Sequence, residues 1–509
     1  MTERGSAATI ASLVARAVDE DPGRVCVIDG DIRLTLTELM SVADRIRDAL
    51  AAAGTAPGDI VSMQLPNAWT TVAAMVGTWS VGAVVNPITT IYRCSELATI
   101  FDAARPRVVL VSTAGRSGQE DVAAGALRVA GVGSTVLDID RVLSGAPPAD
   151  AVRADVGGGA ATDVALLMFT SGTTGRPKGV LHSHETLLYE AQSIADVFGL
   201  DRTTVFMPSP LAHVTGLLYG VLLPLLVRGS VSLLDRWDPE TAVDLIERDR
   251  CGFTVSATPF LRGLTDCYGR RGTTSALEHF VCGGADIPPA LVAEAEQVTG
   301  IRVARTYGST EMPTLCVVRP DDADGRRLTS EGYPIGEARA RLSDDGELEV
   351  TGPELFLGYL DPRDDADAFT PDGWFRTGDL AAIAADGRIS LTGRKKDLIV
   401  RGGENISAKE VEDLLLLLPT VADVAVVGVP DPLMGERACA VVVPAGAGAV
   451  TLAEVTAHLD AQGIARQKFP ELLWLVDALP RTVSGKVQKF VLRKDATAAV
   501  AEGGVERRR

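Results

Sequence analysis

Short apolar runs that alternate with amphipathic stretches constrain the fold of this chain more than any other feature. The runs at 60–65, 83–85 and 108–111 are separated by stretches with helical periodicity, such as 69–79. Strands that are apolar throughout are typical of parallel sheets that carry helices on both faces. The sequence therefore predicts an α/β protein whose first part is built from layers of helices and largely parallel strands.

Two later parts of the chain have different patterns. Beyond Leu342, short alternating segments around the hairpin signal Asp386-Gly387 predict a small β subdomain. From Ser407 onward, a capped helix, two strands and a second helix predict a compact α+β unit. The last residues, 497–509, are predicted to be disordered.

Composition and charge exclude several classes of protein. The chain has 509 residues, of which 46% are hydrophobic and 23% charged, so it can form more than one domain with a large core. Its formal charge is 49 − 67 = −18. Nucleic acids and anionic membranes bind basic surfaces, so neither is an expected partner. An anionic substrate must then be held by local charges and backbone amides.

Cysteine usage and hydropathy indicate the expected cellular location of the chain. The seven cysteines are scattered without close pairs, which fits neither a disulfide framework nor a zinc site, and a reducing cytoplasm is the expected location. The first residues lack a basic region followed by an apolar core, so no signal peptide is expected. The most apolar later run, 214–227, is interrupted by Gly216, Gly220 and Pro224, so no membrane span is expected.

A glycine- and hydroxyl-rich segment, Phe-Thr-Ser-Gly-Thr-Thr-Gly-Arg-Pro-Lys-Gly at 169–179, follows directly on the apolar run 164–169. Glycines let backbone amides turn toward a ligand, hydroxyls add donors, and Arg176 and Lys178 add positive charge, so the segment suits a polyphosphate. It is not a Walker loop, because Pro177 instead of glycine precedes the lysine. On composition alone, a surface turn is the alternative.

Two more glycine-containing loops follow strand-like runs, Val-Cys-Gly-Gly-Ala-Asp at 281–286 and Arg-Thr-Tyr-Gly-Ser-Thr-Glu-Met at 305–312. Ligands bind at the carboxyl ends of parallel strands, so both loops are consistent with one shared nucleotide site. Tyr307 offers a ring face for a base, Thr310 a hydroxyl, and Glu311 an oxygen ligand for Mg²⁺. The alternative is that Tyr307 packs in a core and Glu311 is solvated.

Several further residues have both a functional and a structural interpretation. Asp379, in an Arg-Thr-Gly-Asp turn, can accept hydrogen bonds from both ribose hydroxyls or can be an ordinary turn residue. His213 stands alone in an apolar region and is either functional or a hydrogen-bonded core residue. Lys486, in a glycine-flanked loop, is either catalytic or solvent-exposed. His182 and His184 have no acidic or thiol neighbour in the sequence and are predicted to be structural, not metal ligands.

The order of these segments resembles the adenylate-forming superfamily, which includes acyl-CoA synthetases, peptide-synthetase adenylation domains and luciferases. The resemblance covers most of the chain: the phosphate loop, Gly-Gly-Ala, Tyr-Gly-x-Thr-Glu, Arg-Thr-Gly-Asp, Gly-Arg-x-x-Asp with Gly-Gly-Glu-Asn, and Pro-x-x-x-x-Gly-Lys. It implies an N-terminal domain at 1–393, a hinge at 394–396 and a mobile α+β C-terminal domain at 397–509. Lys396 occupies the hinge position, where many relatives have aspartate and some have lysine.

The resemblance also implies a role for each motif residue. Thr310 would contact the α-phosphate of ATP, Glu311 would bind Mg²⁺, and Lys486 would bridge the developing acyl-AMP. Asp379 and Arg394 would hold the ribose. The implied phosphate-binding residues are Thr170, Ser171, Gly172, Thr173, Thr174, Gly175 and Lys178. The implied adenine-binding residues are Gly283, Gly284, Ala285, Tyr307 and Gly308. The implied CoA-binding residues are Gly402 and Gly403. The implied acyl-pocket residues are His213, Val214, Thr215 and Tyr219.

The implied reaction has two steps. A carboxylate attacks the α-phosphate of ATP to give acyl-AMP and pyrophosphate, and the acyl group is then transferred to a thiol with release of AMP. Relatives that activate amino acids hold the substrate amine with an aspartate just after the His213 position, and 214–219 contains none. The histidine of Pro-Leu-Ala-His-Val-Thr-Gly is similar to one that lines the acyl pocket of aryl and alicyclic acyl-CoA ligases.

These features favour a carboxylate–CoA ligase of fatty or aromatic acid metabolism that uses ATP, Mg²⁺ and CoA. The expected acid has an uncharged acyl body of medium size. A free-standing enzyme that loads an acid onto a carrier-protein phosphopantetheine is the runner-up. A non-catalytic nucleotide-binding scaffold is a third possibility, against which the retention of Lys486, Glu311, Asp379 and Arg394 argues. A homodimer is compatible with the sequence.

Overall fold

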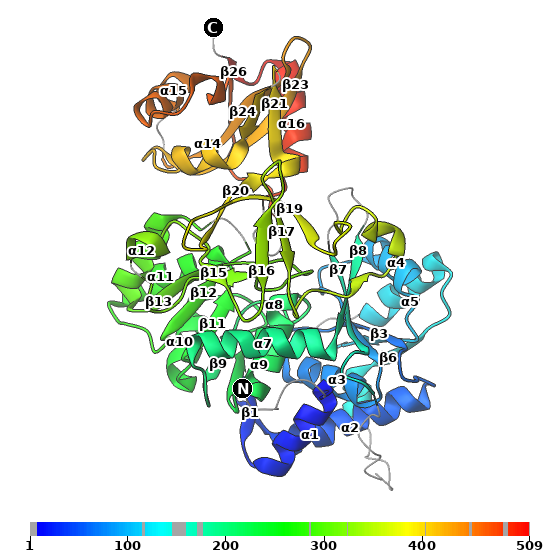
Figure 1. Ribbon diagram of the computed structural model, residues 1–509. Coiled ribbons are helices and arrows are strands. Elements are labelled where there is room, and N and C mark those ends of the chain that lie inside the picture. The colour runs from blue at the N-terminus through cyan, green and yellow to red at the C-terminus, as the bar shows by residue number, and fades with distance from the viewer. Residues whose placement is uncertain are drawn as a thin grey trace.

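A computed structural model describes residues 8–114, 118–144, 159–170, 177–284, 287–322, 324–402, 404–446, 450–481 and 487–507. Within these ranges, three sheets form a large N-terminal part and a fourth forms a small C-terminal part (Figure 1). The predicted fold class, a large α/β domain followed by a small α+β domain, is confirmed.

The first large sheet contains the strand that leads into the glycine-rich loop. Its order is β18-β8-β7-β4-β3-β5-β6, and the five strands from β7 to β6 are parallel. These are β3 (Ile60–Gln64), β4 (Val84–Pro87), β5 (Val108–Val111), β6 (Thr135–Asp138) and β7 (Val164–Thr170). The last two strands, β8 (Lys178–Ser183) and β18 (Gly358–Tyr359), are antiparallel to their neighbours. The glycine-rich segment therefore connects two antiparallel strands.

The second large sheet carries the other two predicted loops at the ends of adjacent strands. Its order is β15-β14-β13-β12-β11-β9-β10-β1-β2. Its parallel strands are β1 (Val25–Asp29), β9 (Thr204–Met207), β10 (Ser230–Leu233), β11 (Phe253–Ser256), β12 (His279–Cys282) and β13 (Arg302–Tyr307). Its antiparallel edge strands are β2 (Ile32–Thr35), β14 (Cys316–Val317) and β15 (Tyr333–Pro334).

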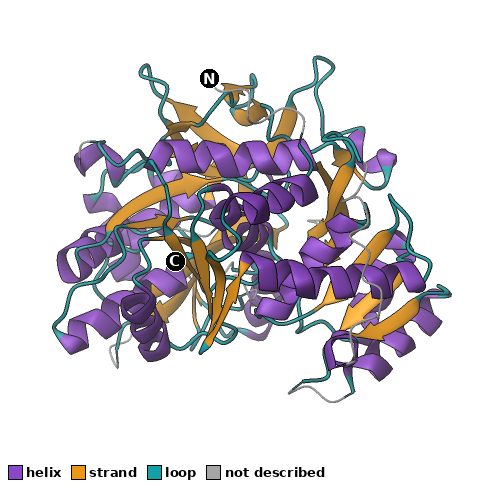
Figure 2. Cartoon of the chain, turned by 90° about the horizontal axis from the view of Figure 1, so that it is seen from below, coloured by secondary structure: helices purple, strands orange, loops and turns teal. Residues whose placement is uncertain are grey.

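Helices cover both large sheets (Figures 1 and 2). The largest apolar core contains residues of both sheets together with α2 (Leu36–Ala52), α3 (Trp69–Ser80) and α7 (His184–Phe198). The first sheet is also covered by α4 (Cys94–Ala104) and α5 (Gln119–Ala130). The second sheet is also covered by α10 (Pro239–Asp249), α11 (Thr258–Arg271) and α12 (Pro289–Thr299). The remaining helical segments of the N-terminal part are α1 (Ile10–Glu20), α6 (Ile139–Ser144), α8 (Val214–Leu217), the π-helix η1 (Leu218–Leu222), α9 (Leu223–Leu226) and α13 (Asp324–Arg327).

The predicted small β subdomain is an antiparallel sheet in the order β16-β17-β19-β20. Its strands are β16 (Arg339–Leu342), β17 (Glu347–Thr351), β19 (Phe375–Ile383) and β20 (Ile389–Arg394). The hairpin predicted at Asp386-Gly387 joins β19 to β20, and Gly387 has a φ of +89°, which favours glycine. A 3₁₀ segment, η2 (Pro362–Asp365), precedes β19.

The C-terminal part packs three helices on one mixed sheet. Its strands are β21 (Leu398–Arg401), β22 (Glu404–Ser407), β23 (Val421–Asp431), β24 (Gly435–Pro444), β25 (Leu472–Leu475) and β26 (Glu506–Arg507). Its helices are α14 (Ala408–Leu415), α15 (Leu452–Ala461) and α16 (Lys489–Glu502), with short 3₁₀ segments η3 (Lys395–Asp397) and η4 (Arg466–Lys468). The exact boundaries at 393 and 397 stay predictions.

The prediction that the tail is disordered was wrong for 497–507. Helix α16 covers 497–502, and its buried residues Leu492 and Ala496, which precede the predicted tail, pack the helix against the C-terminal sheet. Beyond the helix, Glu506 pairs with Leu473 to add β26 to the sheet edge. The apolar stripe lies before position 497, so the tail considered by itself did not reveal the helix.

Within the ranges that the structure describes, no helix combines the length and the apolar character that crossing a membrane requires.

Candidate active site

Two of the predicted glycine loops lie together at the carboxyl ends of two neighbouring strands of the second large sheet. Strands β12 and β13 are parallel neighbours, with Cys282 opposite Arg305, so Gly283 and Gly308 follow them at the same end. Both positions require glycine. A Cβ on Gly283 would lie 2.6 Å from the Thr306 methyl carbon, and one on Gly308 would lie 1.9 Å from the carbonyl oxygen of Pro313.

Three predicted nucleoside-binding residues from separate motifs contact one another. The Tyr307 hydroxyl donates a hydrogen bond to Asp379 Oδ2 at 2.6 Å, and both side chains are buried. Asp379 faces Arg394 across strands β19 and β20, and Arg394 Nε lies 2.9 Å from Asp379 Oδ1. Burial, followed by the charge of Asp379, raises the pKa of Tyr307 well above its ordinary value, so the hydroxyl keeps its proton at pH 7. A ring and a charged carboxylate–guanidinium pair therefore meet in one place.

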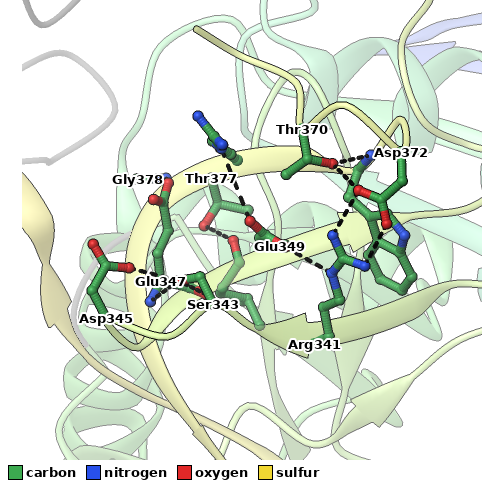
Figure 3. A network of polar contacts seen from close by, with 12 residues as sticks. Arg341, Ser343, Asp345, Glu347, Glu349, Thr370, Asp372, Thr377 and Gly378 are labelled. Atoms are coloured by element: carbon green, nitrogen blue, oxygen red, sulfur yellow. Dashed lines mark hydrogen bonds and ion pairs between the residues drawn. The ribbon is translucent and has the colours of Figure 1, made fainter.

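Within β19, the residues just before Asp379 are held by the buried carboxylate of Glu347, which Figure 3 shows with Thr377 and Gly378. Glu347 Oε1 accepts from the backbone amide of Gly378 at 2.9 Å, and its Oε2 accepts from Lys395 Nζ at 3.0 Å. The Thr377 hydroxyl donates to the carbonyl of Leu348 at 2.7 Å and accepts from the Asp379 amide at 3.1 Å. These hydrogen bonds fix the backbone at Asp379 and thereby the position of its carboxylate.

The segment Thr310–Glu311 is held by two residues that were not predicted as site residues. His182 Nε2 lies 2.8 Å from the carbonyl oxygen of Thr310, and Tyr359 donates its hydroxyl proton to Glu311 Oε1 at 2.9 Å. Complete burial lowers the pKa of His182 to about 4, so the ring is neutral at pH 7. Because a carbonyl can only accept, Nε2 carries the proton. His182 is thus bonded within the protein, as is His184, whose Nδ1 accepts from the Ile10 amide at 3.2 Å.

The phosphate loop is anchored at both of its ends. Thr170 and Lys178 face each other where β7 and β8 begin to pair. Lys178 Nζ lies 4.5 Å from the centre of the Tyr359 ring and 3.8 Å from Asp364 Oδ1. Several predicted site residues lie outside the residues that the structure describes, namely Ser171, Gly172, Thr173, Thr174, Gly175, Ala285, Gly403 and Lys486.

The predicted acyl-pocket residues lie on one short helical segment. His213 precedes α8, in which Val214 and Thr215 are half-buried, and Tyr219 lies on the adjoining π-helix. The Tyr219 hydroxyl is 2.5 Å from both Glu190 Oε1 and the Thr314 hydroxyl, in a fully buried cluster. Burial raises the pKa of Glu190 to about 7. This segment is therefore tied to α7 and to the loop that follows Glu311.

The predicted hinge connects the small β sheet to the C-terminal part. Lys395 forms ion pairs with Asp345 at 2.6 Å and with Glu347 at 3.0 Å. The pKa of the neighbouring Lys396 is lowered by desolvation and then by the charge of Arg394. Gly402 follows β21 with a φ of +58°, and its amide donates to the carbonyl of Met434 at 2.7 Å.

The sequence is similar to those of known proteins, and this similarity shows the family to which the chain belongs. The model of the AMP-binding enzyme family matches residues 14–360, and the model of its C-terminal domain matches residues 410–486. A medium-chain fatty-acid–CoA ligase of Escherichia coli K12 is 34% identical, over 93% of this chain and 88% of its own length. A salicylyl-CoA synthase / salicylate adenylyltransferase of a Streptomyces species is 35% identical, over 92% of this chain and 90% of its own.

Solved structures agree with this assignment. The crystal structure of ATP-bound MatB from Rhodopseudomonas palustris matches with a TM-score of 0.87 at 30% identity, covering 96% of this chain and 99% of MatB. The apo structure of the same enzyme covers the same shares and gives a TM-score of 0.76. The chain belongs to the AMP-binding enzyme family. The predicted resemblance to adenylate-forming enzymes is confirmed, and relatives named as carboxylate–CoA ligases confirm the predicted enzyme class, an AMP-forming acid–thiol ligase.

Proposed function

We propose that this chain is an ATP-dependent carboxylate–CoA ligase. It converts an acid and ATP to acyl-AMP and pyrophosphate, and then transfers the acyl group to CoA with release of AMP. The contact of Tyr307 with Asp379 and of Asp379 with Arg394 carries this proposal, because it unites residues of three motifs in one polar site. Tyr307, with Gly283, Gly284, Ala285 and Gly308, would frame adenine, and Asp379 and Arg394 would bind the ribose.

The first step brings an anionic nucleophile to an anionic phosphate, so the protein must supply positioning and positive charge. Lys178 and the amides and hydroxyls of 170–175 would hold the phosphates. The Thr310 hydroxyl would contact the α-phosphate, and its backbone is fixed by the bond from His182. Lys486 would neutralise charge that develops between the carboxylate and the α-phosphate.

Glu311 is the residue that would hold Mg²⁺. Its Oε1 accepts one hydrogen bond from Tyr359, and within the described ranges no lysine or arginine forms an ion pair with it. A carboxylate with an oxygen left over for coordination is a ligand that suits this cation. Bound Mg²⁺ would stabilise negative charge on the phosphates.

The proposal also covers the thiol that accepts the acyl group and the class of acid that is activated. Gly402 and Gly403 would border the CoA channel once the C-terminal domain has rotated about Lys396. The higher TM-score to ATP-bound MatB than to apo MatB, at equal coverage, supports the presence of a conformation here that is close to the ATP-bound one. His213, Val214, Thr215 and Tyr219 would line a pocket for an uncharged acyl body of medium size.

Loading of a carrier-protein phosphopantetheine stays the runner-up. One relative is named an adenylyltransferase as well as a CoA synthase, and the first of these names specifies adenylation without an acceptor. A cytoplasmic location is proposed as well, supported by seven cysteines without disulfides, of which six are buried. A homodimer stays a prediction.

The test is a panel of aliphatic, alicyclic and aryl acids, each incubated with ATP and Mg²⁺. AMP release is measured with CoA, with a phosphopantetheinylated carrier protein, and with neither thiol. We expect CoA-dependent thioester and stoichiometric AMP for at least one acid class. Thioester on the carrier protein alone would establish the runner-up. Pyrophosphate exchange is measured with the same acids, and its absence for all of them would leave a non-catalytic scaffold.

A further inference from the structure

The segment 356–360 joins the phosphate-loop strand to Glu311. On one side, its backbone extends the first large sheet, because Gly358 and Tyr359 pair with Leu181 and Val180 of β8. The Leu360 amide also donates to the carbonyl of Gly179 at 2.7 Å. Strand β8 begins at Lys178, directly after the phosphate loop. The segment is therefore in fixed register with the end of that loop.

On its other side, the same segment binds Glu311 at two points. The Phe356 amide donates to the Glu311 backbone carbonyl at 2.9 Å, and the Tyr359 hydroxyl donates to the Glu311 carboxylate at 2.9 Å. One contact fixes the main chain of Glu311 and the other fixes the rotation of its carboxylate. Neither residue belongs to a motif that the proposed function uses.

The Tyr359 ring is itself rigidly packed. It is 7% exposed, and its centre lies 4.9 Å from that of Phe356, which stacks on Phe369 at 5.3 Å. The Tyr359 amide donates to Asp365 Oδ1 at 2.9 Å, which fixes the backbone as well. A hydroxyl on a ring held in this way can move little, so it can orient the carboxylate to which it donates.

We propose that Tyr359 is a positioning residue that orients Glu311 for cation binding and sets its distance from Lys178. One face of the ring carries Lys178 Nζ at 4.5 Å, while the hydroxyl engages Glu311 Oε1, so a single side chain touches a proposed phosphate ligand and the proposed cation ligand. With Oε1 engaged by the Tyr359 hydroxyl, Oε2 would be the oxygen left to bind a cation. This inference rests on the proposed function, in which Glu311 holds that cation.

The test is Tyr359→Phe in the full chain, which removes the hydroxyl and keeps the ring. Binding of Mn²⁺ to the enzyme–ATP complex is measured by electron paramagnetic resonance, and ATP binding without divalent cation is measured by calorimetry in EDTA. Loss of a residue that orients a metal ligand weakens metal binding by about 10- to 100-fold. We expect a loss of that size in Mn²⁺ affinity and wild-type affinity for ATP in EDTA.

A matched control is Tyr268→Phe. Tyr268 donates to Glu247 at 2.7 Å in the core of the second sheet, so this variant removes an equivalent hydroxyl–carboxylate bond remote from the phosphate loop. It should bind Mn²⁺ as the wild type does. If Tyr359→Phe fails to fold, Tyr359→Met provides the comparison for Mn²⁺ affinity, since methionine fills the site without a donor, although it also removes the ring that Lys178 contacts.

Glu311→Gln, alone and combined with Tyr359→Phe, separates the proposed metal role of Glu311 from the proposed positioning role of Tyr359. If Tyr359 acts through Glu311, its replacement has no further effect on Mn²⁺ affinity in the Glu311→Gln background. A Glu311→Gln variant with wild-type Mn²⁺ affinity would remove the metal role from the proposed function. A loss in Glu311→Gln together with unchanged binding in Tyr359→Phe would overturn the positioning role alone.

Discussion

His213 introduces the helical segment that we assign to the acyl group, and it lies apart from the Tyr307, Asp379 and Arg394 contacts. His213→Ala should therefore change the KM for the acid and the order of preferred acids, by about tenfold for the best acid, with little effect on the KM for ATP. The measurement is kcat/KM across the acid panel at saturating ATP.

His458→Ala is the matched control, because that imidazole bonds to the Leu414 carbonyl at 2.9 Å in the C-terminal domain. An acid profile shared by His213→Ala and the wild type would remove the imidazole from the pocket.

Glu190 makes the stability of the protein depend on pH. Its folded-state pKa is raised to about 7 by burial, whereas an unfolded glutamate titrates near 4.3. Between these values the folded protein keeps the proton that the unfolded chain has lost. The free energy of unfolding therefore falls as pH rises through this window, by about 4 kcal/mol from this group. The contribution is fully present below the lower pKa.

Glu190→Gln should remove that part of the slope, since glutamine still accepts from the Tyr219 hydroxyl. The difference in urea midpoint between variant and wild type, compared at pH 5 and pH 7.5, isolates Glu190 from His182. Burial of His182 acts with the opposite sign, because its lowered pKa of about 4 makes stability rise with pH up to about 6.5. A pH-independent difference would show that Glu190 does not titrate in this range.

Motif residues could be predicted, whereas the residues that position them could not. Tyr307 and Asp379 each lie next to a glycine in a short motif, and such motifs can be found in the sequence. The hydrogen bond between them, however, joins positions 72 residues apart. The contact from His182 to Thr310 spans 128 residues and that from Tyr359 to Glu311 spans 48. No local propensity encodes such a contact, because it depends on how β8, β13 and β18 are placed.

At the scale of elements, apolar pattern was a sound guide to the large sheets. All four residues of β5 are buried, as expected for a parallel strand with helices on both faces. The pattern did not reveal β18, whose two residues form too short a strand to have a period. It also missed α16, whose apolar face is only a narrow stripe. Elements that depend on tertiary pairing were therefore the ones that sequence could not predict.

The predicted hinge lies in η3, whose first residue, Lys395, forms ion pairs that would resist its movement. Lys395 is bound by Asp345 and Glu347, so rotation about Lys396 starts from a tethered neighbour. Lys396→Pro fixes φ near −65° and should confine the C-terminal domain to one orientation. One half-reaction should then fall far more than the other, by about a hundredfold in relative terms.

Single-turnover rates of adenylation and of thioester formation measure that ratio. Lys396→Ala is the control, because it removes the same side chain and leaves the backbone mobile. Equal losses of both half-reactions in the proline variant would indicate misfolding instead of a trapped hinge.

At the scale of the whole molecule, the two half-reactions make opposite demands on one site. In the proposed function, adenylation would need Lys486 near the α-phosphate, while thioester formation would need the thiol of CoA to enter beside Gly402 and Gly403. Residues from two domains would thus serve the acyl-AMP in turn. The C-terminal part, which stands above β19 and β20 in Figure 1, has a sheet and an apolar core of its own, as the proposed rotation of this part as a unit would require.

Lys486→Ala tests this alternation, because it removes one positive charge from the first transition state only. In a site shielded from water such a contact is worth about 3 to 4 kcal/mol, so adenylation should fall at least about a hundredfold. Thioester formation from supplied acyl-AMP and CoA should survive, since that step turns Lys486 away. Lys494→Ala, an exposed position on α16, should leave both single-turnover rates unchanged. Comparable losses in both steps would contradict the two-orientation mechanism, and an unchanged first step would make Lys486 an ordinary surface lysine.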